Sequence, residues 1–234
     1  MAVYKIFPSA DATMYSAYPA KNTGRDEVAL LDQSPYYSYD LAANDNYTTT
    51  ANIYPTNDIR RSLIQFSNQD LAIIQTFASQ SISGSWDAYL KVNLAFAQNL
   101  SSIYTLETYA VSQSWNMGTG KYTTVPEIRN GVCWDFTGPY SASVAWSGSY
   151  GLDILWENIN VYWNNLDILW DFTQPAIPNG GGSWYSNYGS SQTFDYMSNK
   201  DINMNVSNIV DAWFSGSIPN NGLILKHPQA VEED

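Results

Sequence analysis

Cysteine and histidine, on which many enzymes rely, occur only once each in this sequence of 234 residues. Nucleophilic catalysis of the Ser-His-Asp or Cys-His type needs a histidine, and His227 lies outside any recognisable motif. Histidine-cluster metal sites and cysteine-rich zinc sites are excluded by the same counts. The single Cys133 rules out an intrachain disulfide framework, and we expect it to be a small core residue beside Trp134. The sequence therefore favours a protein that is not an enzyme.

Basic residues are also scarce, because ten Lys and Arg stand against 22 Asp and Glu, for a net charge of −12. Such a charge repels nucleic acid, anionic lipid and acidic polysaccharide. We predict no cofactor, with Ca²⁺ as the alternative for Asp11, Asp26 and Glu27, which otherwise read as solvated loop charges because no calcium-loop spacing is present. Paired carboxylates for glycoside hydrolysis stay open, because a sequence does not give their separation.

Long apolar runs are missing as well, since no stretch approaches 18 consecutive apolar residues, and we predict no membrane partner. The first seven residues show no basic region followed by a long apolar stretch, so we expect no export signal. This favours a protein assembled in the cytoplasm.

The most informative stretch that is present runs from Asp201 to Lys226. Apolar residues recur at helical spacing over 206–214, which predicts a short helix with Asn205 or Ser207 available as its N-cap. Gly216 is expected to end the helix, and Leu223-Ile224-Leu225 reads as a buried strand.

Short apolar runs separated by turn residues predict an all-β fold, a jelly-roll-like antiparallel β-sandwich forming one domain over residues 1–234. Candidate strands are residues 3–7, 12–15, 26–31, 60–66, 88–96 and 104–111, with 88–96 and 104–111 expected to pair as a hairpin. Residues 73–81 fit a helix or a strand, and the tyrosine-rich residues 33–58 are expected to form an extended loop.

Several segments, in this order, resemble DNRLRE-type domains, which are β-sandwich modules of secreted polysaccharide-active proteins. They are Asp11-Ala12-Thr13 with Asn22-Thr23-Gly24, Arg60–Phe66, and the stretch from Asp201 to Lys226. A closer similarity, to structural proteins of tailed marine bacteriophages that use this sandwich, is carried by Met117–Tyr122, Asn130–Trp134, Gly181–Tyr185 and Ser191–Phe194.

Resembling domains continue past the strand that ends at Lys226, so the resemblance implies that the last strands are lacking here or are borrowed from a partner. An unpaired sheet edge invites strand addition, so we expect an oligomer.

Aromatic residues form 15% of the chain, and one aromatic patch is duplicated. Leu152–Trp156 returns as Leu166–Trp170, and Asn164-Asn165 suits a hairpin turn between 159–163 and 166–170. The patch is either a strand pair in the core or a projecting hairpin that docks a neighbouring subunit. Candidate residues for an interface or for stacking on a sugar are Trp156, Tyr162, Trp163, Trp170, Trp184 and Tyr185. Trp115 and Trp134 are expected to be structural, and Trp213 is expected to lie in the core. For Trp184 a structural role is the alternative to ligand binding.

The favoured function is that of a non-enzymatic virion structural protein of a tailed phage, in the tail, the fibres or the capsid surface. Its partners would be other virion proteins or copies of itself, and it would be assembled in the host cytoplasm. The alternative is a carbohydrate-binding module for a host-surface glycan, and a third hypothesis is a glycan lyase or hydrolase subdomain. An exposed aromatic platform would favour glycan binding, whereas buried tryptophans and an apolar inter-subunit face would favour the structural role.

Overall fold

The computed structural model describes residues 3–31, 33–40, 52–80, 86–96, 102–141, 144–147, 180–195, 197 and 200–232. Its elements are β1 (Ala10–Tyr15), β2 (Gln33–Asp40), β3 (Asn52–Gln65), α1 (Asn68–Gln80), β4 (Tyr89–Val92), β5 (Ile103–Val111), β6 (Trp184–Asp195), β7 (Ile202–Asn205), α2 (Ser207–Phe214), β8 (Leu223–Lys226) and α3 (Gln229–Glu232). The repeated aromatic segment, with the expected hairpin over 159–170, lies outside the described residues.

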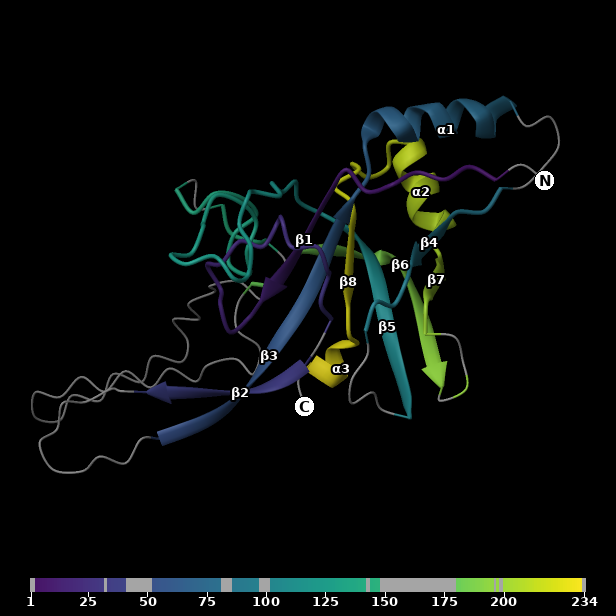
Figure 1. The fold of residues 1–234 in the computed structure, drawn as a ribbon. Coiled ribbons are helices and arrows are strands. Elements are labelled where there is room, and N and C mark those ends of the chain that lie inside the picture. Colours follow the sequence, from purple (N-terminus) through teal and green to yellow (C-terminus); the bar gives the residue numbers. More distant parts are fainter. Residues whose placement is uncertain are drawn as a thin grey trace, which may run out of the picture.

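The main sheet is antiparallel and has the strand order β1-β3-β8-β5-β6, while β4 and β7 form a second antiparallel sheet (Figure 1). β8 lies between β3 and β5, with Leu63 opposite Ile224 and Thr108 opposite Leu225. The expected all-β antiparallel sandwich is confirmed. The strand that ends at Lys226 lies in the middle of the sheet. The expectation that the last strands are lacking or borrowed from a partner stays a prediction.

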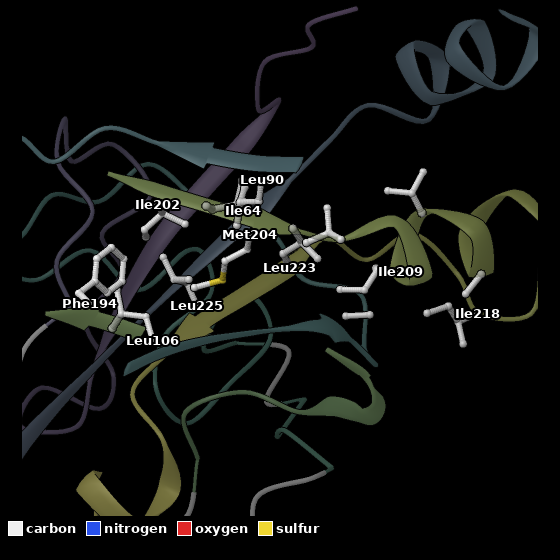
Figure 2. Packing of buried hydrophobic residues seen from close by; sticks show 14 residues of the cluster. Ile64, Leu90, Leu106, Phe194, Ile202, Met204, Ile209, Ile218, Leu223 and Leu225 are labelled. Atoms are coloured by element: carbon white, nitrogen blue, oxygen red, sulfur yellow. The ribbon is translucent and has the colours of Figure 1, made fainter. Parts of the chain in front are cut away.

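The central strands of the main sheet have a core on each face, and neighbouring residues of each strand point to opposite cores. On one face, Ile64, Leu223 and Leu225 pack with residues of β4, β7 and α2. Figure 2 shows this cluster, with Met204 of β7 beside Leu225 of β8. The other face packs against a tryptophan-rich region, where Trp115, Trp134 and Trp146 join residues of β1, β3, β5 and β8.

The helix and strand predicted after Asp201 are confirmed as α2 and β8, and all four β8 residues are buried. Gly216 follows the helix with a φ of 73°, which glycine adopts without steric cost. The N-cap prediction was wrong, because Val206 occupies that position and no side chain caps it. Asn205 instead accepts a hydrogen bond from the Ser207 amide, and the Ser207 hydroxyl accepts one from the Ala88 amide, which ties α2 to the segment before β4.

Three other strand predictions were wrong. Residues 3–7 form no strand, and most of their side chains are exposed. Residues 26–31 also form no strand, because the backbone of Leu30 bonds to side chains and not to a neighbouring strand. Its amide donates to Thr13 Oγ1, and its carbonyl accepts from Ser62 Oγ. The expected hairpin between 88–96 and 104–111 does not form, since β4 pairs with β7 and aligns Leu90 with Met204, whereas β5 pairs with β6 and β8.

Residues 33–58 were expected to be a loop, but most of them belong to strands. β2 pairs with the first half of β3, from Gln33 opposite Ile59 to Asp40 opposite Asn52 (Figure 1). Tyrosine, threonine and isoleucine favour strands, and prolines are tolerated in a ribbon whose strands pair on one side only. Residues 68–80 form α1, so the described part of the segment left open between helix and strand, residues 73–80, is helical.

Asn22 joins the β1 side of the molecule to the tryptophan-rich region. This side chain is fully buried; its amide nitrogen donates to the carbonyls of Met117 (2.7 Å) and Val132 (2.8 Å), and its oxygen accepts from the Gly120 amide (2.8 Å). Gly118 and Gly131 pack against Asn22 so closely that a Cβ atom at either position would collide with it. The Asn-x-Gly and Met-Gly-Thr-Gly segments are therefore parts of one contact.

We expect Asn22→Ala to lower the free energy of unfolding by roughly 2–4 kcal/mol, because it leaves buried backbone groups unpaired at about 1–3 kcal/mol each. Urea unfolding followed by tryptophan fluorescence measures the change. Asn203→Ala, at an exposed position of β7, is the matched control. Equal stability of the two variants would contradict the role given to Asn22.

Candidate functional site

A buried group of charges lies on the tryptophan-rich side of the main sheet. Arg61 comes from β3, Lys226 from β8 and Glu232 from α3, and their side chains are 4%, 2% and 1% exposed. Glu107 of β5 completes the group at 23% exposure. Because β3 and β5 flank β8, this strand order brings Arg61, Lys226 and Glu107 together on one face, and α3 places Glu232 against them.

Arg61 uses all of its donor nitrogens within this group. Its Nε and Nη2 donate to the two carboxylate oxygens of Glu232, at 3.1 and 2.7 Å, and its Nη1 donates to the Gly181 carbonyl at 2.8 Å. Such two-pronged contacts are among the strongest ion pairs that proteins make. The guanidinium also lies over the rings of Trp134 and Trp184, 4.9 and 5.3 Å from their centroids.

Lys226 adds a second cation to the same carboxylate. Its Nζ lies 3.6 Å from Glu232 Oε2 and 3.5 Å from Glu107 Oε2, and it donates a hydrogen bond to the His227 carbonyl. Burial lowers the pKa of the Lys226 ammonium, which Glu232 and Glu107 partly oppose. Two cations and two carboxylates then give a group with no net formal charge.

Of the six candidate binding residues from the sequence, the structure describes Trp184 and Tyr185; Trp156, Tyr162, Trp163 and Trp170 lie outside the described residues. Trp184 is half-buried, stacks on Tyr109 at 6.1 Å and lies 5.5 Å below the Lys226 ammonium. Tyr185 packs against the other core and meets Tyr188 edge to face. The structure therefore does not bring these two neighbours together on one surface.

The remaining described tryptophans contribute mainly to packing. Trp115, Trp134 and Trp146 are at most 9% exposed, which confirms the structural role expected of Trp115 and Trp134, and Trp213 is partly buried against the other core. Cys133 is buried, as expected, and burial raises the pKa of its thiol.

A second aromatic group is already occupied by an internal cation. The Lys21 ammonium lies 4.5 and 4.6 Å from the ring centroids of Tyr18 and Tyr122, and Tyr122 packs on Tyr15 at 4.9 Å. The Tyr15 hydroxyl is buried and has no hydrogen-bond partner among the described residues. Burial, with the charge of Asp26, raises its pKa far above the usual value.

Two of the three acids that were weighed as Ca²⁺ ligands, Asp26 and Glu27, have protein partners. Asp26 accepts a hydrogen bond from the Tyr122 amide, and Glu27 forms an ion pair with Lys121 that lowers the pKa of its carboxyl. The pKa of Asp11 is raised by burial and by the charge of Asp26. Within the described ranges, no group of three or more His, Cys, Asp or Glu side chains is arranged to hold a metal ion.

An exposed apolar surface lies at the end of the molecule where the N-terminal segment runs beside α1 (Figure 1). We call it the N-terminal–α1 surface and define it by Tyr4, Phe7, Ile73 and Phe77, which are 59%, 78%, 43% and 48% exposed. Tyr4 and Phe77 have their ring centroids 5.0 Å apart, and a hollow lined by residues 4–9, Asp70 and Ile73 opens beside them. Ile73 and Phe77 are four residues apart, so they lie on one helical face.

The sequence analysis predicted neither the buried charge group nor the N-terminal–α1 surface. Residues 3–7 resemble a strand in the sequence because their apolar residues alternate. The residues of the charge group are far apart in the chain, with Arg61 and Glu232 separated by 171 positions. A buried partner for the arginine before the Ser-Leu-Ile strand could not be read from any local pattern.

Comparison with known proteins assigns no family, since no protein-family model, curated protein or solved structure matches this chain. The resemblance to DNRLRE-type domains stays a prediction. None of the described helices has the length and hydropathy needed to span a bilayer.

Replacing one ion of the buried group should destabilise the protein strongly. We expect Arg61→Met to lower the free energy of unfolding by about 3–5 kcal/mol, because the buried carboxylate of Glu232 loses its two-pronged partner. Adding Glu232→Gln to Arg61→Met should recover part of this loss, and urea unfolding of the four proteins in this double-mutant cycle measures the coupling. Glu27→Gln, in the exposed ion pair with Lys121, should change little. Additive effects of the two core substitutions would refute the coupling.

Tyr15 should make the protein sensitive to alkaline pH. Its pKa is raised in the folded state, so stability is fully present below about pH 10, the unfolded value, and falls as the pH rises further, because only the unfolded chain ionises. Tyr15→Phe should flatten this fall and cost little at pH 7, since the hydroxyl has no described hydrogen-bond partner. Urea unfolding between pH 8 and 11 tests this, with the exposed Tyr89→Phe as control; identical slopes for Tyr15→Phe and the unmodified chain would contradict it.

Proposed function

We propose that this protein is a non-enzymatic structural component of a tailed-phage virion, at the tail, the fibres or the capsid surface, that acts through protein–protein assembly. The observation that carries the proposal is the N-terminal–α1 surface, on which four large apolar side chains are exposed together. Exposed apolar clusters of this kind mark surfaces that a partner covers. As part of the same proposal, the protein is assembled in the host cytoplasm.

The arrangement of α1 supports an interface. Leu71 is buried, and Gln75 donates to the Phe214 carbonyl of α2, so the helix is attached to the body of the protein. Ile73 and Phe77 nevertheless face solvent, and a rigid helix presents them at low cost in conformational entropy. The surface is a ready-made anchor for a second protein.

Two further observations favour assembly over the alternatives. Trp115, Trp134 and Trp146 are buried, which leaves no flat platform of these rings for a sugar, and the net charge of −12 disfavours nucleic acid. The N-terminal–α1 surface carries few charges, and Lys5 and Asp70 are among them. Association of like-charged copies through it therefore brings few charges into contact. We therefore propose that this surface binds a second copy of the same chain.

The test is the mass of the protein by light scattering on a size-exclusion column, over a range of concentrations. We expect a defined oligomer, and Phe77→Glu should weaken the association at least tenfold, because a carboxylate would be buried without a partner. Thr76→Glu adds the same charge at the neighbouring exposed position and is the matched control. A monomer at all concentrations, or equal masses for the two variants, would overturn self-assembly through this surface.

A further inference from the structure

The last described helix, α3, is inserted into the protein mainly through one residue. Glu232 is its buried residue, whereas Gln229, Ala230 and Val231 are exposed. The amides of Val231 and Glu232 bond to the Pro228 carbonyl, which forms the single turn of the helix. Isolated helices of so few residues are unstable in water, so α3 depends on what Glu232 binds.

The groups that receive Glu232 are fixed without help from α3. Arg61 extends from β3, Lys226 from β8 and Trp184 from the start of β6, all in the main sheet. The Gly181 carbonyl accepts from Arg61 Nη1 at 2.8 Å, and the Trp134 ring lies 4.9 Å from the guanidinium. This support leaves Nε and Nη2 directed at one carboxylate.

The charge of these groups matches one carboxylate. Without Glu232, the two cations and Glu107 sum to one positive charge, which a monoanion neutralises. Arg61 provides the planar fork that fits a carboxylate, and Lys226 adds a point charge 3.6 Å from Oε2. The arrangement is that of a ligand site whose ligand is part of the same chain.

We infer that Arg61, Lys226 and Trp184 form a carboxylate-binding site for a glutamate-bearing peptide segment, and that α3 is the segment that fills it in this chain. A peptide is the partner because the occupant itself is a glutamate on a short segment with its neighbouring side chains exposed. Glu232 is the buried side chain of α3, so its departure opens the site to an acidic segment of another protein. This site is separate from the N-terminal–α1 surface and does not depend on it.

The experiment uses the full chain carrying Glu232→Ala, which vacates the site, and a blocked synthetic peptide with the sequence of residues 227–232. We expect saturable binding, read as a change in tryptophan fluorescence and a rise in the thermal midpoint. The same peptide carrying Glu232→Gln should bind at least tenfold more weakly. The unmodified protein should also bind the peptide at least tenfold more weakly, because its own Glu232 competes. Arg61→Met added to Glu232→Ala should abolish binding.

Sodium acetate against sodium chloride at equal ionic strength separates a general carboxylate effect from peptide recognition. Acetate should raise the thermal midpoint of Glu232→Ala above the chloride value, and the peptide should do so at much lower concentration. If Glu232→Ala does not fold alone, the readout becomes recovery of the folded protein on dilution from urea with peptide, acetate or chloride. Equal results for the glutamate and glutamine peptides, or no gain over chloride, would overturn the proposal and leave Glu232 a structural ion.

Discussion

Burial of the central strands of the main sheet on both faces is the constraint on which the rest of this structure depends. Every residue of β8 is buried, as are most of residues 58–65 of β3, so their side chains must find partners in one of two cores. Apolar residues satisfy this by packing. Arg61 and Lys226 cannot, and their desolvation makes Glu232 and Glu107 necessary on the same face. The ion group is thus a consequence of the central position of the strands that carry it.

Elements with a strong local pattern could be predicted from the sequence, whereas the pairing of distant strands could not. α2 and β8 were predictable because each has a strong local period and adjacent turn residues, as in Val206–Phe214 and Leu223-Ile224-Leu225. Strand partners were not, because β4 finds β7 about 110 positions away and aligns Leu90 with Met204. Residues 3–7 have a strand-like period, but a period reports which side chains could share a face and not whether a ladder exists.

The candidate site was less predictable than the fold. Trp184 was a candidate for ligand binding because the chain is rich in aromatic residues. In the structure it contacts Arg61, Lys226 and Tyr109 of the same chain. Sequence gave no sign of that, because the strand order alone brings these residues together. Trp134 was predicted to be structural because it lies in a glycine-containing motif, but its contact with Gly180 and Gly181, where a Cβ atom would collide with the ring, could not be predicted from the sequence.

Charge and hydrophobicity are placed in this protein against the usual rule, and the two departures have different explanations. Buried ions generally cost stability unless each is paired, so Arg61, Lys226 and Glu232 persist because they hold one another. Much of the apolar area of Tyr4, Phe7, Ile73 and Phe77 stays in water in the isolated chain, and that part does not contribute to its stability. The first departure is resolved within one molecule. We propose that a partner that covers the surface resolves the second, and this difference is why we assign assembly to the N-terminal–α1 surface and attachment of α3 to the ion group.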